Sequence, residues 1–212
     1  MSLRLGDTAP NFKAITSQGP IDWYDYLGDH WGILFSHPAD YTPVCTTELG
    51  KTAALKDEFD RRNTKVLALS IDSVEKHLGW IKDIHETQNC EISFPIIADH
   101  DRRIAEQYGF IHPQASDTGT VRSLLIIGPD KLVKLIITYP ASVGRNFWEV
   151  LRVLDALQLA SQYPVVTPAN WQHGEKVLVS LSVPTPSAYR QFPMGVEVVN
   201  SYLRYTPMPG KQ

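Results

Sequence analysis

Short apolar runs alternate with segments of helical periodicity between residues 31 and 138. Each apolar run is bounded by polar or turn-forming residues, as is typical of strands that are buried on both faces of a sheet. This alternation predicts an α/β fold in which helices cover a mostly parallel sheet. Strands are expected over residues 32–35, 66–71, 124–127 and 132–137.

Turn residues and amphipathic segments separate the expected strands. The sequence Gly128-Pro129-Asp130 lies between the last two strands and predicts a hairpin, because these residue types favour turns. Residues 47–62 place Leu49 and Phe59 among charged side chains with the spacing of an amphipathic helix. Further helices are expected over residues 74–87, 102–108 and 146–159.

The composition is that of a globular chain with one sizeable core. Of the 212 residues, 43% are hydrophobic and 20% are charged, and the net charge is -3. No run of Lys or Arg occurs, so neither nucleic acid nor a membrane is an expected partner. No stretch approaches the ~18 apolar residues that span a bilayer, and residues 1–20 show no targeting signal, so we expect a cytoplasmic protein.

The character of the sequence changes after residue 162, where proline becomes frequent and helical patterns become rare. We therefore predict a main domain of residues 1–162 and a small, extended subdomain of residues 163–212. Aromatic residues in this tail indicate that it packs rather than remaining disordered. They are Trp171, Tyr189, Phe192, Tyr202 and Tyr205.

The densest group of reactive residue types lies in residues 35–49, between a predicted buried strand and the first predicted helix. Cys45 falls near the first turn of that helix, where free backbone amides and the helix dipole favour a thiolate. Pro43 marks the turn, because proline is tolerated at a helix start but not within a strand ladder. Thr42 offers a hydroxyl to the sulfur or to a bound oxygen, and Pro38 is placed to shield the site from water.

Each of these residues also has a purely structural interpretation. A buried free cysteine often behaves as a small hydrophobic side chain. Thr42 and Pro38 are common turn residues, and Arg122, just before a predicted strand, fits a salt bridge. His37 fits either a role in orienting a thiolate or a hydrogen bond to the backbone. Taken singly, the residues leave both interpretations open.

Taken together, the residues match a known motif. Pro38, Thr42 and Cys45 have the PxxxTxxC spacing that marks peroxiredoxins, and residues 43–48 extend the match. Arg122 stands where that family has its active-site arginine. The chain thus resembles the peroxiredoxins.

Other segments resemble the one-cysteine, peroxiredoxin-six-like branch of that family. They are residues 139–146, 149–153, 157–159, 166–171 and 202–207, so the resemblance covers essentially the whole chain. The resemblance implies a thioredoxin-like fold with peroxiredoxin insertions, followed by a carboxyl-terminal dimerisation subdomain over residues 163–212. It also implies a homodimer, with a higher oligomer left open.

The resemblance implies a thiol-dependent peroxidase. The thiolate attacks one oxygen of hydrogen peroxide or an organic hydroperoxide, donors stabilise the leaving oxygen, and the cysteine becomes a sulfenic acid. The expected catalytic residues are Cys45, Arg122, Thr42 and Pro38, and the expected supporting residues are His37, Arg145 and Glu48.

The second cysteine, Cys90, lies in a segment without a redox motif. Typical two-cysteine peroxiredoxins carry a resolving cysteine in the carboxyl-terminal region, whereas residues 91–212 contain none. We therefore expect an external reductant, either a small thiol such as glutathione or a redox protein. A resolving role for Cys90 remains the alternative.

The sequence disfavours two other enzyme classes, metal-dependent enzymes and phospholipases. Seven histidines and two cysteines occur without CxxC, HxxxH or HxH spacing, so no metal or other cofactor is expected. Some members of the branch have a phospholipase segment Gly-Asp-Ser-Trp-Gly, which here has His30 in place of serine, while Tyr24 replaces the expected histidine. Because nucleophile and base are both missing, no lipid hydrolysis by that route is expected.

A binding or chaperone-like protein with an incidental cysteine is the alternative outside enzymes. An incidental cysteine tolerates the change Cys45→Ser, whereas a peroxidase loses its function.

Overall fold

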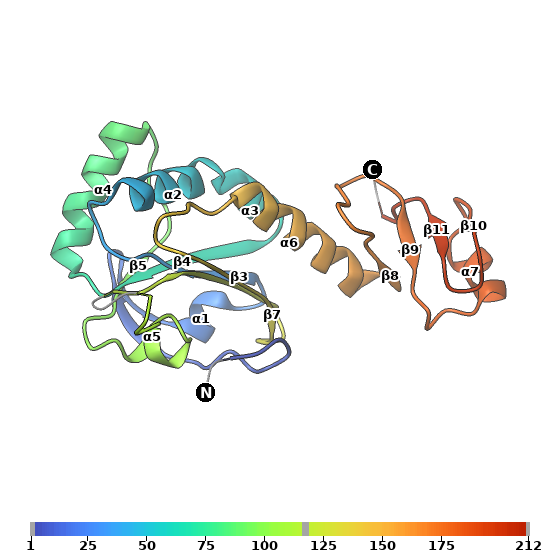
Figure 1. Ribbon diagram of the computed structural model, residues 1–212, viewed down its shortest axis with the longest axis horizontal. Helices are drawn as coiled ribbons and strands as arrows, with labels where there is room; N and C mark the ends of the chain where they lie inside the picture. The colour runs from blue at the N-terminus through green and yellow to red at the C-terminus, as the bar shows by residue number, and fades with distance from the viewer. Residues whose placement is uncertain (1–2, 116–118, 211–212) are drawn as a thin grey trace. The chain divides into compact units, whose positions relative to one another are not determined.

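The computed structural model describes residues 3–115 and 119–210, and the chain forms two compact units, Met1–Phe147 and Trp148–Gln212 (Figure 1). The division falls between Phe147 and Trp148, so the helix α6 (Phe147–Gln162) lies almost entirely in the second unit. The domain boundary at residue 162 remains a prediction. Within the described residues, no helix has the length and apolar character that crossing a membrane requires.

The first unit is built on a seven-stranded sheet with the order β2-β1-β5-β4-β3-β6-β7. The interior strand β3 is buried at every position, as its apolar sequence predicts. The strands are β1 (Lys13–Thr16), β2 (Gly19–Asp22), β3 (Trp31–Ser36), β4 (Thr64–Ser70), β5 (Ile96–Ala98), β6 (Arg122–Ile127) and β7 (Val133–Tyr139).

The prediction of a mostly parallel sheet is wrong. Only β3 with β4 and β4 with β5 pair in parallel, whereas the other four neighbouring pairs are antiparallel. Short connections account for two of these antiparallel pairs, because neither the β1–β2 nor the β6–β7 connection is long enough for a parallel crossover. The predicted hairpin at residues 128–130 is confirmed by the pairing of β6 with β7.

Helices cover both faces of this sheet (Figure 1). One face packs on α1 (Trp23–Leu27) and α5 (Arg103–Gln107) through a core that includes Trp23, Leu34 and Leu125. The helices α2 (Pro43–Ala54) and α4 (Val74–Gln88) lie on the opposite side (Figure 1).

The helix predicted over residues 47–62 differs from the structure. It is divided at Leu55 into α2 and α3 (Lys56–Arg61), and α2 already begins at Pro43. The amphipathic pattern did not mark this start because the first residues of the helix are short polar and β-branched residues of low helix propensity. Cys45 therefore lies inside the helix rather than before it.

The second unit combines α6 and α7 (Thr185–Gln191) with a four-stranded sheet of order β10-β11-β9-β8. Its strands are β8 (Val165–Val166), β9 (Val177–Val179), β10 (Glu197–Val198) and β11 (Arg204–Thr206). Trp171 and Phe192 pack in its core, so the prediction that the tail packs is confirmed. Tyr189 and Tyr202 are 55% and 68% exposed.

Candidate active site

Cys45 lies in the first turn of α2, directly after the loop that leaves the carboxyl end of β3. Thr42 is the N-cap, with an extended backbone (φ -114°, ψ 146°), and Pro43 occupies the first turn. Backbone amides in a first turn lack intrahelical acceptors, and the dipole there is positive. The predicted location near a helix start is confirmed, and the Cys45 side chain is fully buried.

Arg122, at the start of β6, brings a guanidinium group to the sulfur. Its Nη1 donates to Cys45 Sγ at 3.2 Å and to Glu48 Oε2 at 2.9 Å. Its Nε and Nη2 donate to the carbonyl oxygen of Ala141 at 2.9 and 2.8 Å. These contacts orient a buried cation, 3% exposed, toward the sulfur.

Glu48 and Arg145 form the support behind Arg122. The carboxylate of Glu48 accepts hydrogen bonds from the backbone amide, Nε and Nη2 of Arg145, at 2.8, 2.9 and 2.7 Å. Burial by itself would raise the pKa of Glu48, but the hydrogen bonds and charge of Arg145, together with the charge of Arg122, lower it. Two guanidinium groups and one carboxylate leave a net positive charge, which favours negative charge on the Cys45 sulfur.

Thr42 and Pro38 lie in the same loop and are half-buried. The hydroxyl of Thr42 donates its proton to the carbonyl oxygen of Ala39 at 2.9 Å, so its oxygen can still accept a further hydrogen bond. Their roles at the peroxide remain predictions.

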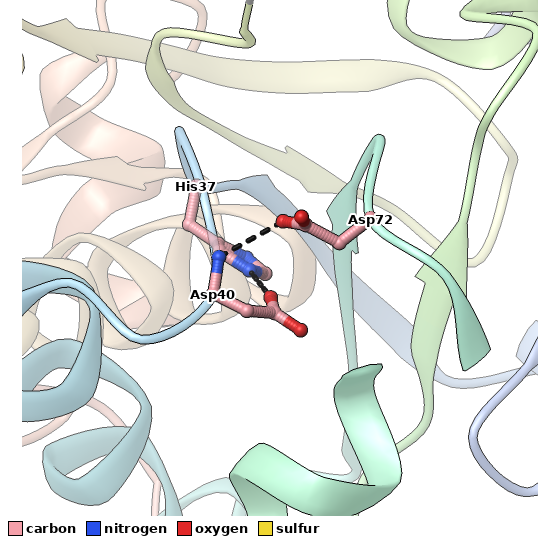
Figure 2. A group of neighbouring side chains, drawn as sticks. All are labelled: His37, Asp40 and Asp72. Atoms are coloured by element: carbon pink, nitrogen blue, oxygen red, sulfur yellow. Dashed lines mark hydrogen bonds and ion pairs between the residues drawn. The ribbon is translucent and has the colours of Figure 1, made fainter. Parts of the chain in front are cut away.

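His37 is fully buried at the end of β3 and faces Asp40 (Figure 2). Its Nε2 lies 2.8 Å from Asp40 Oδ1, while Asp40 Oδ2 lies 2.6 Å from Nδ1 of His77 in α4. Burial lowers the pKa of His37, against the opposing effect of Asp40. The His37 ring thus forms its hydrogen bond with a carboxylate. The alternative of a hydrogen bond from the ring to the backbone is not what the structure has.

Neither Asp40 nor His77 is marked as a site residue by a pattern in the sequence. Asp40 lies three residues after His37, a spacing that is unremarkable in a loop. His77 is 37 residues further along the chain from Asp40, so no local signal connects them.

Figure 2 also shows Asp72 beside His37 and Asp40, with one potential ligand atom from each within 4.8 Å of the others. Asp72 accepts a hydrogen bond from the Asp40 backbone amide at 2.9 Å and forms an ion pair with Lys76. The two carboxylates of the cluster therefore have hydrogen-bond donors and a cationic side chain as partners, and the expectation that no metal binds remains a prediction.

Cys90 follows the end of α4 and is a free thiol, like Cys45. Burial raises the pKa of Cys90, which disfavours the thiolate that a resolving thiol needs. This supports the external reductant over an internal one.

The residues of the phospholipase segment are engaged in other contacts. Nδ1 of His30 lies 3.1 Å from the carbonyl oxygen of Leu27, and the hydroxyl of Tyr24 donates to the carbonyl oxygen of Ala9. Asp130, which the resemblance aligns with the third catalytic position of that phospholipase, forms an ion pair with Lys134. None of the three residues is a serine, so none supplies a serine-type nucleophile.

A hollow of about 640 Å³ lies elsewhere in the first unit. It is lined by residues of β1, β2 and α5, including Ile15, Asp22 and Arg103, and by none of the residues around Cys45. A hydroperoxide group is small, so the charged groups at Cys45 indicate the site better than cavity size does.

Two family models match the chain. Residues 5–136 match the AhpC/TSA family, and residues 156–187 match the C-terminal domain of 1-Cys peroxiredoxin. A 1-Cys peroxiredoxin of Dictyostelium discoideum is 53% identical over 209 residues, covering 99% of this chain and 87% of the relative. Peroxiredoxin-6 of Gallus gallus is 51% identical, and 98% of each chain is covered.

Solved structures agree with these sequence relatives. A mutant of peroxiredoxin 6 of Arenicola marina superimposes with a TM-score of 0.93 at 44% identity, covering 99% of this chain and 100% of the other. A yeast mitochondrial 1-Cys peroxiredoxin gives a TM-score of 0.91 at 48% identity, covering 97% and 99%. The thioredoxin-like α/β fold is confirmed, and the chain belongs to the AhpC/TSA family of peroxiredoxins, in its one-cysteine branch.

Proposed function

We propose that Cys45 is the nucleophile of this peroxiredoxin and that Arg122, held by Glu48 and Arg145, is its main electrostatic partner. As a member of this family the protein is a thiol-dependent peroxidase, which reduces hydroperoxides. The observation that carries the assignment of residues is the 3.2 Å contact between Arg122 Nη1 and Cys45 Sγ at the start of a helix.

The reaction follows from these groups. The Cys45 thiolate attacks one oxygen of the hydroperoxide, the S–O bond forms, and the O–O bond breaks. The leaving oxygen takes the electron pair of that bond and a proton, giving water or an alcohol. Arg122 stabilises the negative charge that develops on this oxygen. The two-electron oxidation leaves a sulfenic acid on Cys45.

Pro38 and Thr42 complete the site in this proposal. Pro38 limits access of bulk water from the loop, and Thr42 accepts a hydrogen bond from the O–H of the bound peroxide through its free lone pairs. The fixed bond from Thr42 to Ala39 supports the second role, because it leaves the oxygen as an acceptor.

An external thiol returns Cys45 to its reduced state in this proposal. One thiol condenses with the sulfenic acid to a mixed disulfide and releases water, and a second thiol displaces Cys45. The yeast mitochondrial relative is described as resolving its thiol through glutathione and thioredoxin systems, which makes a glutathione-type thiol or a redox protein the first candidates here.

A homodimer and a cytoplasmic location are further parts of the proposal. The second unit carries exposed apolar side chains, including Val198, Val199 and Tyr202, which suit an interface between copies of the chain. The predicted carboxyl-terminal dimerisation subdomain over residues 163–212 rests on the same feature.

Intact-mass spectrometry after one equivalent of hydrogen peroxide and a sulfenic-acid trap tests the assignment. We expect one adduct that is lost in Cys45→Ser and retained in Cys90→Ser. An internal disulfide that requires both cysteines would make Cys90 the resolving thiol. An unmodified Cys45 would exclude the peroxidase assignment and leave the binding or chaperone-like alternative.

A further inference from the structure

Behind the Cys45 site, three buried side chains form a continuous series from His37 through Asp40 to His77. The two histidines are 0% exposed and Asp40 is 3% exposed. The Asp40 carboxylate lies between the imidazoles, with its oxygens 2.8 Å from His37 Nε2 and 2.6 Å from His77 Nδ1. One loop supplies His37 and Asp40, and α4 supplies His77.

Both ring nitrogens of His77 face hydrogen-bond acceptors. Its Nε2 lies 3.1 Å from the carbonyl oxygen of Ile97 in β5, and a carbonyl oxygen can only accept. Its Nδ1 faces the carboxylate of Asp40. An imidazole that donates from both nitrogens is an imidazolium.

The charges around His77 agree with this protonation state. Burial would raise the pKa of Asp40, but the hydrogen bonds and charges of His37 and His77 lower it to about 2, so Asp40 is a carboxylate near neutrality. The neighbouring anion, Asp72, is already paired with Lys76. A buried carboxylate requires a partner charge, and His77 supplies it for Asp40.

His37 is the neutral member of the series. Burial lowers its pKa, and its one proton lies on Nε2, from which it donates to Asp40. Its Nδ1 therefore carries a lone pair, and this atom is buried without a hydrogen-bond partner among the described residues.

The His37 ring is connected through Trp80 to α2, the helix that carries Cys45. Its centre lies 5.2 Å from that of Trp80, whose indole Nε1 donates to Thr46 Oγ1 at 3.1 Å, next to Cys45. The hydroxyl of Thr120, two residues before Arg122, donates to the carbonyl oxygen of His37 at 2.6 Å.

We propose that His77 is a positioning residue of the peroxidase: as a buried imidazolium it holds Asp40 ionised and thereby fixes His37 in the tautomer with its acceptor at Nδ1. The importance of His77 for the reaction rests on the proposed function, in which Cys45 is the nucleophile. The described groups that face His77 are Asp40 and His37 from the loop after β3, and the Ile97 carbonyl from β5; Asp72 and Lys76 neutralise each other beside them.

Long-range ¹H–¹⁵N spectra of the ¹⁵N-histidine-labelled full chain test the protonation states directly. We expect both ring nitrogens of His77 to carry a proton near neutral pH, because each of them faces an acceptor. We expect His37 to be protonated on Nε2 alone. An unprotonated ring nitrogen on His77 near neutral pH, or a proton on Nδ1 of His37, would overturn the proposal. Signals are assigned with His37→Asn and His77→Gln.

The pH profile of Cys45 sulfenylation tests the consequence for the reaction. In His77→Gln the cation is lost, so the Asp40 carboxylate favours protonation of His37. We compare the rate of Cys45 sulfenylation at roughly pH 6 with the rate at roughly pH 8, and we expect this ratio to be about tenfold lower in His77→Gln than in the unaltered protein. The control is His85→Gln, which changes an exposed histidine of the same helix and should leave the pH profile of sulfenylation unchanged. Adding His37→Asn to His77→Gln should remove the new ionisation.

The two experiments separate the possible failures. A His77→Gln profile identical to that of the unaltered protein would overturn the positioning role. If Cys45 were not oxidised in the unaltered protein, the proposed function would fail while the spectra still reported the state of His77. The spectra of the unaltered protein decide the protonation state even if His77→Gln does not fold.

Discussion

Arg145 donates three hydrogen bonds to Glu48, one from its backbone amide and two from its guanidinium group. The remaining contact of Glu48 Oε2 is to Arg122, the residue that reaches the Cys45 sulfur. The position of the cation at the nucleophile is therefore set by a carboxylate that does not touch the nucleophile itself.

Replacing Glu48 by Gln should impair both the reaction and the fold. Two buried guanidinium groups then lack their shared anion, which costs about 3–5 kcal/mol of unfolding free energy. Displacement of Arg122 should slow sulfenylation of Cys45 by about 10²-fold. Urea unfolding and stopped-flow oxidation measure the two effects. Glu58→Gln, which breaks more exposed ion pairs with Arg61 and Arg62, is the control and should leave both the unfolding free energy and the oxidation rate nearly unchanged.

Replacing Arg122 by Lys should keep the charge but lose the fork that contacts Cys45, Glu48 and Ala141 together. We expect the rate constant for Cys45 oxidation by hydrogen peroxide to fall by about 10²–10³-fold. Arg103→Lys, at an exposed position, is the matched control. A rate within about twofold of the unaltered protein would show that charge alone suffices.

The stability of the fold should decrease in acid because of Asp40. The folded pKa of about 2 lies below the ordinary aspartate pKa of 3.8, so the carboxylate stabilises the fold fully above pH 3.8, and this contribution of about 2 kcal/mol is lost as pH falls toward 2. Burial lowers the pKa of His37 in the folded state, so the fold also loses stability as the pH falls below the ordinary histidine pKa of 6.5. Urea unfolding of the unaltered chain and of Asp40→Asn across this range measures the difference. An equally steep fall in Asp40→Asn would contradict the assignment to Asp40.

Gly32 in β3 is required for packing. A Cβ at this position would lie 2.8 Å from Leu27 Cδ1 and 3.0 Å from Trp23, closer than side chains tolerate. Gly32→Ala should therefore destabilise the fold by about 1–3 kcal/mol, as overpacking does. In the double variant with Leu27→Ala the two losses should not add, because the smaller side chain makes room. Additive losses would show that the contact with Leu27 is not the cause.

Sequence patterns with a local physical basis were predictive. The buried strands around β3 and β4, the hairpin after β6 and the cysteine at a helix start depend on neighbouring residues, and the structure confirms them. The motif from Pro38 to Cys45 indicated the peroxiredoxin family, and the family model and the known relatives confirm this membership. Local patterns misplaced the start of α2 and the sheet's direction, because a helix start depends on capping and a strand's direction on its connections.

The sequence by itself determined that this chain is an α/β peroxiredoxin with a cysteine at the start of a helix, since strand burial, turns and the motif are written within short windows. Only the tertiary structure decided which groups surround that cysteine. Glu48 meets Arg122 and Arg145 across separations of 74 and 97 residues, and Asp40 meets His77 across 37. Such pairings form only when the strands and helices pack together at one end of the sheet. A charge buried there destabilises the fold unless its partner charge lies beside it.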